Sequence, residues 1–297
     1  MQNGPTYKCG IVDIDTSGFR SFTTLKPNRL WANAKINWNF VTIGDQNSFY
    51  KDVNIGLSKA DVDTVKAAMK QIEDETCFKF EQVKNPTKGQ PWLLIHRIGK
   101  HREHTCQLSY VQQNLVGKDI AGLGDIFSNF MDDTKETVCF NGAFAGYGSD
   151  SPQSLVISQT ELNAQNQDAV GLIVHELLHN LGLGHTQKRQ DAKDNIDINW
   201  KNIDETRHDQ YKACIEEDDP ACKNYKNYNT YRTPYDCSSI MHYGYTDFLS
   251  KEAQEAQGQK TMVAKDPRTC KLSPYGKNKL SKTDVDIINK MYCKGTR

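Results

Sequence analysis

One run of eleven residues constrains this chain more than any other part of it. The run from His175 to His185 reads H-E-x-x-H-x-x-G-x-x-H. His175 and His179 stand four residues apart, so both imidazoles project from one face of a helix. Gly182 lets the chain leave that helix in a left-handed turn, which can bring His185 round to the same side. Three neutral imidazoles leave a fourth position open on a zinc ion, as catalytic zinc requires.

Glu176 follows the first histidine directly and adds a general base to the expected metal site. At this position a carboxylate can reach a water molecule at the zinc ion without being a ligand itself. The apolar residues 170–174 lead into the motif, which fits a core helix over 168–181 that carries the site on one face. Two buried histidines on an ordinary core helix are the alternative. The added glycine and third histidine favour a site for one catalytic Zn²⁺ ion.

A second motif lies downstream, where residues 239–243 read S-I-M-H-Y. Zinc proteases with the extended histidine pattern carry a methionine turn beneath the metal. We therefore expect Met241 to form an apolar floor under the histidine rings, and His242 to be structural. Tyr243 is placed to donate a hydrogen bond to the oxygen of a substrate carbonyl, with a buried packing tyrosine as the alternative.

The two motifs together resemble the astacin family of zinc endopeptidases, and the resemblance covers residues 29–297. Further matches are the R-x-D of residues 189–191, the segment 235–243 and the closing run 281–293. In that family the tyrosine that matches Tyr243 also ligates the resting zinc and swings away during turnover. The resemblance therefore implies that Tyr243 is catalytic.

The resemblance implies an α+β fold of the metzincin type, a two-lobed zinc protease. The upper lobe, residues 29–182, would hold a mixed twisted sheet and the zinc helix. The lower lobe, residues 183–297, would be irregular and carry a C-terminal helix. Periodicity and capping boxes predict helix 57–76, strands 78–83, 92–98 and 154–158, and helix 281–292. In astacin-like enzymes the strand at 154–158 would be the open edge that pairs with an extended substrate.

The chain departs from the family directly after the third histidine. Active members carry a glutamate there, which is linked to the newly formed amino terminus. Here the position is Thr186, which has no charge. The family's activation link therefore has no counterpart at this position.

The chain has nine cysteines, a number that favours an oxidising compartment and leaves at least one thiol unpaired in a monomer. The resemblance implies one disulfide, Cys77–Cys293. Cys214 and Cys222 bracket a short acidic loop and are expected to pair locally. The remaining pairs are Cys237–Cys270 and Cys106–Cys139. The last pair departs from the family, because no cysteine stands just before the zinc helix to take Cys139.

This pairing leaves Cys9, which precedes the region that resembles the mature enzyme. We therefore expect residues 1–28 to be a pro-segment and residues 29–297 the catalytic domain. A thiolate is a good zinc ligand, so Cys9 could occupy the open zinc position and keep a zymogen latent. A free cysteine in a tail and a bond to another chain are the alternatives. Asp13 and Asp15 are the nearby carboxylates that could act instead, as an aspartate does in typical astacins.

Charge and hydropathy exclude several classes of partner. The chain has 37 basic and 37 acidic residues, so no global field favours nucleic acid or an anionic membrane. No apolar run reaches the length of a transmembrane helix. The Lys-, Asn- and Tyr-rich stretch 211–235 could stack on nucleotides, but the acidic residues 216–219 favour a solvated loop. We expect a secreted monomer that acts on protein and peptide substrates.

Three functions remain compatible with these motifs. The first is a secreted zinc endopeptidase made as a latent precursor. The second is a catalytically silent protein that uses the fold for binding, which the intact Glu176 disfavours. The third is a zinc-dependent hydrolase of non-peptide esters, which no feature of the sequence favours.

Overall fold

The computed structural model describes residues 30–40, 57–84, 91–98, 100–101, 105–106, 142–143, 153–158, 167–213 and 232–293. Several expected features lie outside these residues: the pro-segment 1–28 with Cys9, and the side chains of Cys106, Cys139, Cys214 and Cys222. Within them, no helix is both long enough and apolar enough to span a bilayer.

The main sheet has five strands in the order β2-β1-β3-β7-β6. These strands are β1 (Lys35–Phe40), β2 (Lys79–Gln82), β3 (Leu93–Ile98), β6 (Gly142–Ala143) and β7 (Gln153–Ser158). The first four in spatial order are parallel, and β6 runs antiparallel to β7. Two short strands beyond β3, β4 (Lys100–His101) and β5 (Thr105–Cys106), form a separate hairpin-like pair.

The expectation that residues 154–158 form an open edge is wrong. Strand β7 lies inside the sheet, between β3 and β6. The two residues of β6, Gly142 and Ala143, pair with Val156 and Leu155, so β7 is not an edge strand at these two positions. A strand of two residues has no periodicity that a sequence pattern could reveal.

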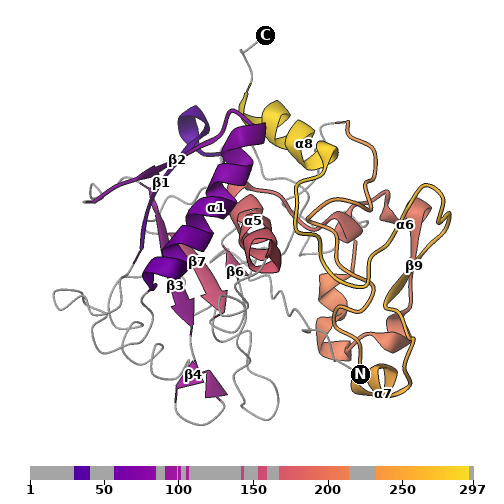
Figure 1. The fold of residues 1–297 in the computed structure, drawn as a ribbon. Helices are drawn as coiled ribbons and strands as arrows, with labels where there is room; N and C mark the ends of the chain where they lie inside the picture. Colours follow the sequence, from indigo (N-terminus) through magenta and orange to yellow (C-terminus); the bar gives the residue numbers. More distant parts are fainter. Residues whose placement is uncertain are drawn as a thin grey trace.

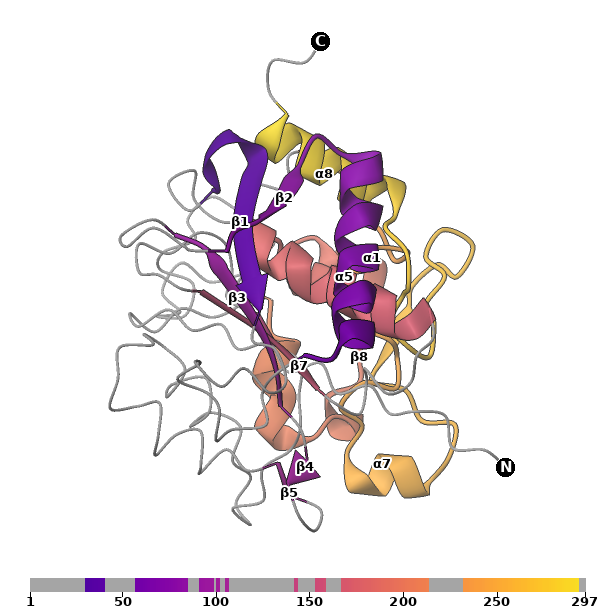
Figure 2. The ribbon, with the colours of Figure 1, turned by 60° about the vertical axis from the view of Figure 1, so that its left-hand side comes forward.

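Two helices cover one face of this sheet, as Figures 1 and 2 show. They are α1 (Lys59–Glu75) and α5 (Gln167–Leu181). Helix α1 starts with the expected capping box between Ser58 and Asp61. The apolar stripe of α1, the inner side chains of the sheet and the apolar part of α5 form one core cluster. From Ile173 to Leu181 every residue of α5 is buried, the polar ones included.

The lower lobe has little regular structure and a core of its own. Its elements are η3 (Thr186–Lys188), α6 (Ala192–Asn195), β8 (Ile196–Ile198), η4 (Trp200–Asn202), η5 (Glu205–Gln210), α7 (Lys251–Glu255) and β9 (Met262–Ala264). Strands β8 and β9 pair antiparallel. A disulfide, Cys237–Cys270, lies in this core with Tyr211 and Tyr243. Within the described part of this lobe, one short sheet, one disulfide and buried tyrosines stabilise a region whose helices are all short.

Helix α8 (Lys282–Tyr292) follows the lower lobe in sequence but packs on the upper one (Figure 1). Ile288 and Met291 of α8 belong to the core cluster of the sheet and α5. The Tyr292 ring contacts Phe78 edge-on at 4.7 Å between centroids. The expected disulfide Cys77–Cys293 is present beside this contact. This disulfide links the C-terminal end of α8 to the chain just after α1, 216 residues earlier in the sequence.

Gly171 is the point where α5 touches the loop that precedes α8. A Cβ atom at this position would stand 2.3 Å from the Asn278 Cα atom. An isolated helix would gain about 1 kcal/mol from Gly→Ala. Here we expect Gly171→Ala to lower the free energy of unfolding by about 1–3 kcal/mol, because two backbones must separate. Urea unfolding measures the difference.

Gly276, in the same loop, supplies a matched control for this substitution. A Cβ atom there would meet no atom within 4 Å. Gly276→Ala should therefore change the free energy of unfolding by less than about 0.5 kcal/mol. Equal effects of the two substitutions would show that the close approach at Gly171 does not limit stability.

Candidate metal centre

The end of helix α5 turns the chain back toward the two histidines on the helix. Gly182 has a φ of 104°. Its N–H donates to the His179 carbonyl at 2.8 Å, and the Leu183 N–H donates to the Leu178 carbonyl at 2.9 Å. This pair of bonds is the Schellman arrangement, which needs a left-handed residue after the helix. The turn is the one expected at Gly182, and it leads within three residues to His185.

The three histidines converge through their Nε2 atoms. The His175 Nε2 atom lies 3.2 Å from that of His185 and 3.1 Å from that of His179. A ligand atom from each of the three lies within 4.8 Å of the other two. A tetrahedral zinc ion with Zn–N bonds of about 2.0–2.1 Å would hold two such nitrogens about 3.3–3.4 Å apart. The donor set and its spacing therefore fit zinc.

Backbone carbonyls orient two of these rings. The Nδ1 atom of His175 lies 2.7 Å from the Ile240 carbonyl oxygen, and that of His179 lies 2.6 Å from the Leu183 carbonyl oxygen. A carbonyl can only accept, so Nδ1 carries the proton in each ring and Nε2 presents a lone pair. Burial lowers the pKa of His175 to about 4 and the pKa values of His179 and His185 well below their usual range. All three rings are therefore neutral near pH 7, as metal ligation requires.

Glu176 and Met241 are both buried. Glu176 is 1% exposed on α5, next to the first histidine. Met241 is 1% exposed and belongs to the core cluster that includes α5. The Met241 carbonyl accepts a 3.0 Å hydrogen bond from the Thr186 N–H, which ties the methionine turn to the residue after His185.

Tyr243 lies beside the third histidine, in a box of aromatic rings. Its ring centroid is 4.1 Å from that of His185, 5.6 Å from that of Tyr211 and 5.5 Å from that of Phe248. The residue is 2% exposed. Its hydroxyl donates to the Gln210 Oε1 atom at 3.4 Å.

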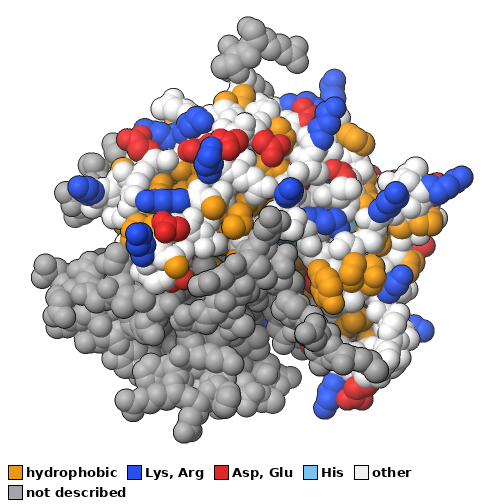
Figure 3. Space-filling model, in the orientation of Figure 1, with side chains coloured by type: hydrophobic (Ala, Val, Ile, Leu, Met, Phe, Trp, Pro, Cys, Tyr) orange, Lys and Arg blue, Asp and Glu red, His pale blue; other side chains and the backbone are white. Residues whose placement is uncertain are grey.

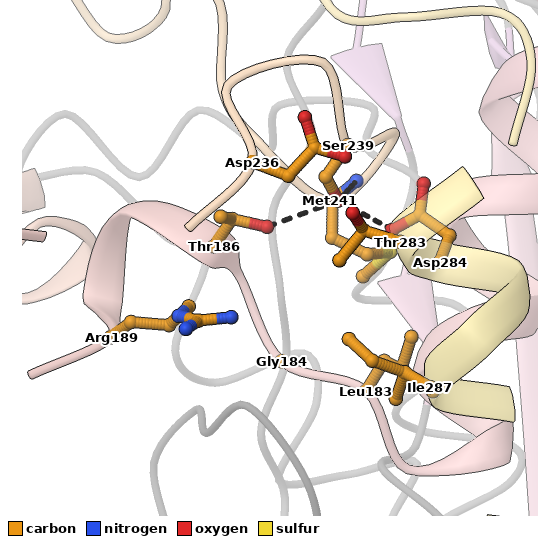
Figure 4. A pocket seen from close by; sticks show the side chains of 10 residues that line it. All are labelled: Leu183, Gly184, Thr186, Arg189, Asp236, Ser239, Met241, Thr283, Asp284 and Ile287. Atoms are coloured by element: carbon orange, nitrogen blue, oxygen red, sulfur yellow. Dashed lines mark hydrogen bonds between the residues drawn. The ribbon is translucent and has the colours of Figure 1, made fainter. Parts of the chain in front are cut away.

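A small pocket is lined by the residues on either side of His185 in the chain, by the methionine turn and by the start of α8 (Figure 4). The Thr186 hydroxyl donates to the Ser239 hydroxyl at 3.1 Å, which in turn donates to the Asp284 carboxylate at 2.6 Å. The cavity volume is about 20 Å³, enough for one water molecule. Where the family has a glutamate after the third histidine, this chain has a hydroxyl relay that ends at the buried Asp284.

Asp284 has a role that the sequence did not reveal. The expected capping box of α8 is present, because Asp284 accepts from the Ser281 N–H at 2.8 Å and Ser281 caps the Asp284 N–H. The same carboxylate also accepts from the Ile240 N–H at 2.9 Å. Ile240 is the residue whose carbonyl orients His175. Asp284 therefore positions the methionine turn and, through it, the first histidine.

Fold and site together define a protein with a three-histidine zinc centre between a sheet-bearing lobe and an irregular lobe. The family model that describes the astacin peptidases matches residues 136–293. The chain belongs to the astacin family.

Relatives of known sequence agree with this assignment. Zinc metalloproteinase nas-10 of Caenorhabditis elegans is 27% identical over 240 residues, which cover 80% of this chain and 34% of that protein. Zinc metalloproteinase nas-11 of the same organism is 28% identical over 239 residues, which cover 80% of this chain and 31% of that protein. The chain thus spans about a third of the length of these two relatives.

Among solved structures, the fold is similar to that of high choriolytic enzyme 1, a hatching enzyme zinc-protease from Oryzias latipes. The TM-score is 0.57 at 20% sequence identity, over 92% of this chain and 99% of that one. At this identity the match establishes the fold alone.

Proposed function

We propose that this chain is a zinc-dependent endopeptidase that hydrolyses peptide bonds in proteins. The observation that carries the proposal is the convergence of three neutral imidazoles at zinc spacing, with the buried Glu176 on the same helix. Both C. elegans relatives bear the name zinc metalloproteinase. When bound, zinc supplies a Lewis acid that polarises the scissile carbonyl and acidifies a water molecule.

Two side chains of this protein move or donate protons in the proposed reaction. Glu176 takes the proton of the attacking water as general base and returns it to the leaving amine. Tyr243 donates a hydrogen bond to the oxygen on which negative charge develops. Met241 supports the histidine rings from below. In the described part of the sheet β6, and not β7, is the edge strand on this side, so β6 is the strand that we propose to pair with an extended peptide.

The balanced charge of the chain fits protein substrates rather than nucleic acid. Figure 3 shows basic and acidic side chains interspersed over one face, with no large region of one sign among the described residues.

We propose a secreted monomer. Two disulfides in the described residues, Cys77–Cys293 and Cys237–Cys270, support an oxidising compartment.

We also propose that the enzyme is made in a latent form, held inactive by its N-terminal segment. Residues 1–28 would act as a pro-segment, and the Cys9 thiolate would be a further ligand of the zinc ion in the latent form. Support comes from the cysteine count, the position of Cys9 ahead of the catalytic domain and the affinity of thiolates for zinc. Thr186 replaces the family's charged partner for a new amino terminus, so release of the block, rather than that ion pair, switches the enzyme on.

Peptide hydrolysis by the zinc-loaded chain, measured before and after limited digestion with trypsin, tests both the peptidase activity and the latency. We expect activity only after the first twenty to thirty residues are removed, and its loss on chelation with recovery when zinc is returned. Cys9→Ser should be active without trypsin. Equal activity before and after cleavage would refute latency, and no hydrolysis of any peptide library would favour the binding-protein alternative.

A further inference from the structure

His242, expected from the sequence to be structural, holds the main chain at Tyr243. The residue is 1% exposed, and its Nδ1 atom lies 2.8 Å from the Tyr243 carbonyl oxygen. A carbonyl can only accept a hydrogen bond, so Nδ1 carries the proton and donates. On the other side, the Tyr243 N–H donates to the Gln187 Oε1 atom at 3.2 Å. Both polar groups of the Tyr243 main chain are therefore bound by buried side chains.

Tyr235 fixes the tautomer of the His242 imidazole. Its hydroxyl lies 2.8 Å from the His242 Nε2 atom, and the two rings pack edge-on with centroids 5.6 Å apart. Burial lowers the pKa of His242 to about 4, so the ring is neutral near pH 7. A neutral ring with its proton on Nδ1 has a lone pair on Nε2, which accepts a hydrogen bond from the Tyr235 hydroxyl. Tyr235 thus favours the tautomer that can donate to the Tyr243 carbonyl.

The R-x-D motif after the third histidine holds Tyr235 in place. The Arg189 guanidinium binds the Asp191 carboxylate through two N–H groups, at 2.8 Å and 2.7 Å. It also donates to the Thr233 carbonyl at 2.9 Å and lies 5.7 Å from the centre of the Tyr235 ring. Arg189 is buried, so its guanidinium joins these groups inside the protein. The motif therefore supports the segment from which Tyr235 reaches His242.

A catalytic side chain that changes its contacts during a reaction turns about its own main chain. The Tyr243 hydroxyl lies at the end of the ring, so a small rotation of the backbone displaces it more than the rest of the side chain, and small displacements of a reacting group slow a reaction strongly. We propose that His242 is a positioning residue, which holds the Tyr243 main chain so that the phenol can reach the oxygen on which negative charge develops. This inference rests on the proposed peptidase function. It gives His242 and the R-x-D motif a common role in the reaction.

Two substitutions of similar size at His242 separate this hydrogen bond from packing. Asn places an N–H close to the position of Nδ1, whereas Leu has nearly the same shape and no donor. In the zinc-loaded, trypsin-treated chain, kcat of His242→Leu should be about tenfold below that of His242→Asn, because the buried Tyr243 carbonyl loses this donor only with Leu. KM should be similar in the two variants, since Tyr243 acts on charge that develops after the substrate has bound. Equal kcat values would overturn the proposal.

The same pair of substitutions in a Tyr243→Phe background tests whether His242 acts through the phenol. Without the hydroxyl, the two variants should have kcat values within about twofold of each other. Their zinc content after dialysis should equal that of the wild type, because the three histidine ligands are unchanged. A tenfold difference in kcat that persists without the hydroxyl, or a zinc content that falls with Leu, would make His242 a structural residue and refute the positioning role.

Nitrogen NMR of the metal-free chain, with isotope-labelled histidine, gives a readout that is independent of turnover. The nitrogen shifts distinguish a protonated from an unprotonated ring nitrogen, and His242→Leu identifies the signals of this ring by their loss. We expect His242 to carry its proton on Nδ1 near pH 7. A proton on Nε2 alone would overturn the hydrogen bond to the Tyr243 carbonyl. Absence of peptide hydrolysis in the wild type would instead remove the proposed function, and the positioning role with it, while a proton on Nδ1 would still report the bond.

Discussion

Replacing Glu176 with Gln is expected to lower kcat for peptide hydrolysis by about 10²–10⁴-fold, the range attributed to a general base. The carboxamide has the same shape as the carboxylate but cannot accept the proton of the attacking water. Glu176 is 1% exposed on a helix in the core. Zinc binding should remain, because the three histidines are unchanged.

Three measurements separate this role from a structural one. Steady-state kinetics gives kcat, metal analysis after dialysis gives the zinc content, and circular dichroism checks the fold. Glu252→Gln, an exposed glutamate on α7, serves as the matched control and should leave all three unchanged. His179→Ala should lose zinc as well as activity. If Glu176→Gln keeps kcat within tenfold of the wild type, another group is the base.

Removing the disulfide Cys77–Cys293 with a double Cys→Ser substitution is expected to cost the most stability of any change considered. The two cysteines are 216 residues apart. Loop-closure entropy for a separation of this size corresponds to about 5 kcal/mol. The cross-link also holds the end of α8 in the core, beside the contact between Phe78 and Tyr292.

The second disulfide offers the comparison. Cys237 and Cys270 are 33 residues apart, which corresponds to about 4 kcal/mol by the same reasoning. Urea unfolding of the two double variants should therefore rank the Cys77–Cys293 variant as the less stable. The reverse order would mean that strain in the folded state, and not the length of the closed loop, decides the effect.

The parts of the site that depend on local spacing were predictable from the sequence. The four-residue step from His175 to His179, the turn at Gly182 and both capping boxes each lie within one helix or its end. The disulfide at Cys77 came from resemblance to a family, and the structure contains it. The helix spacing, the turn and the capping boxes follow from short-range geometry. The disulfide follows from resemblance to a family whose members share one fold.

The parts that depend on pairing between distant segments were not predictable. Strand β6 is too short to leave a pattern, so the edge of the sheet was assigned to the wrong strand. Asp284 was recognised only as a helix cap, because its bond to Ile240 joins residues 44 apart. The hydrogen bonds that join Tyr243 to Gln187 and Gln210 were not predictable either, because they link residues 56 and 33 apart in the sequence.

Helix α8 contacts two segments that position the metal centre. At its start, Asp284 holds the Ile240 backbone that orients His175. At its end, the Tyr292 hydroxyl donates to the Leu181 carbonyl at 2.6 Å, on the last residue of the zinc helix. During synthesis on the ribosome, all three histidines emerge long before α8 does. A nascent chain therefore carries all three histidines before it carries the carboxylate that holds the Ile240 backbone, and His175 gains this support only once translation has passed α8.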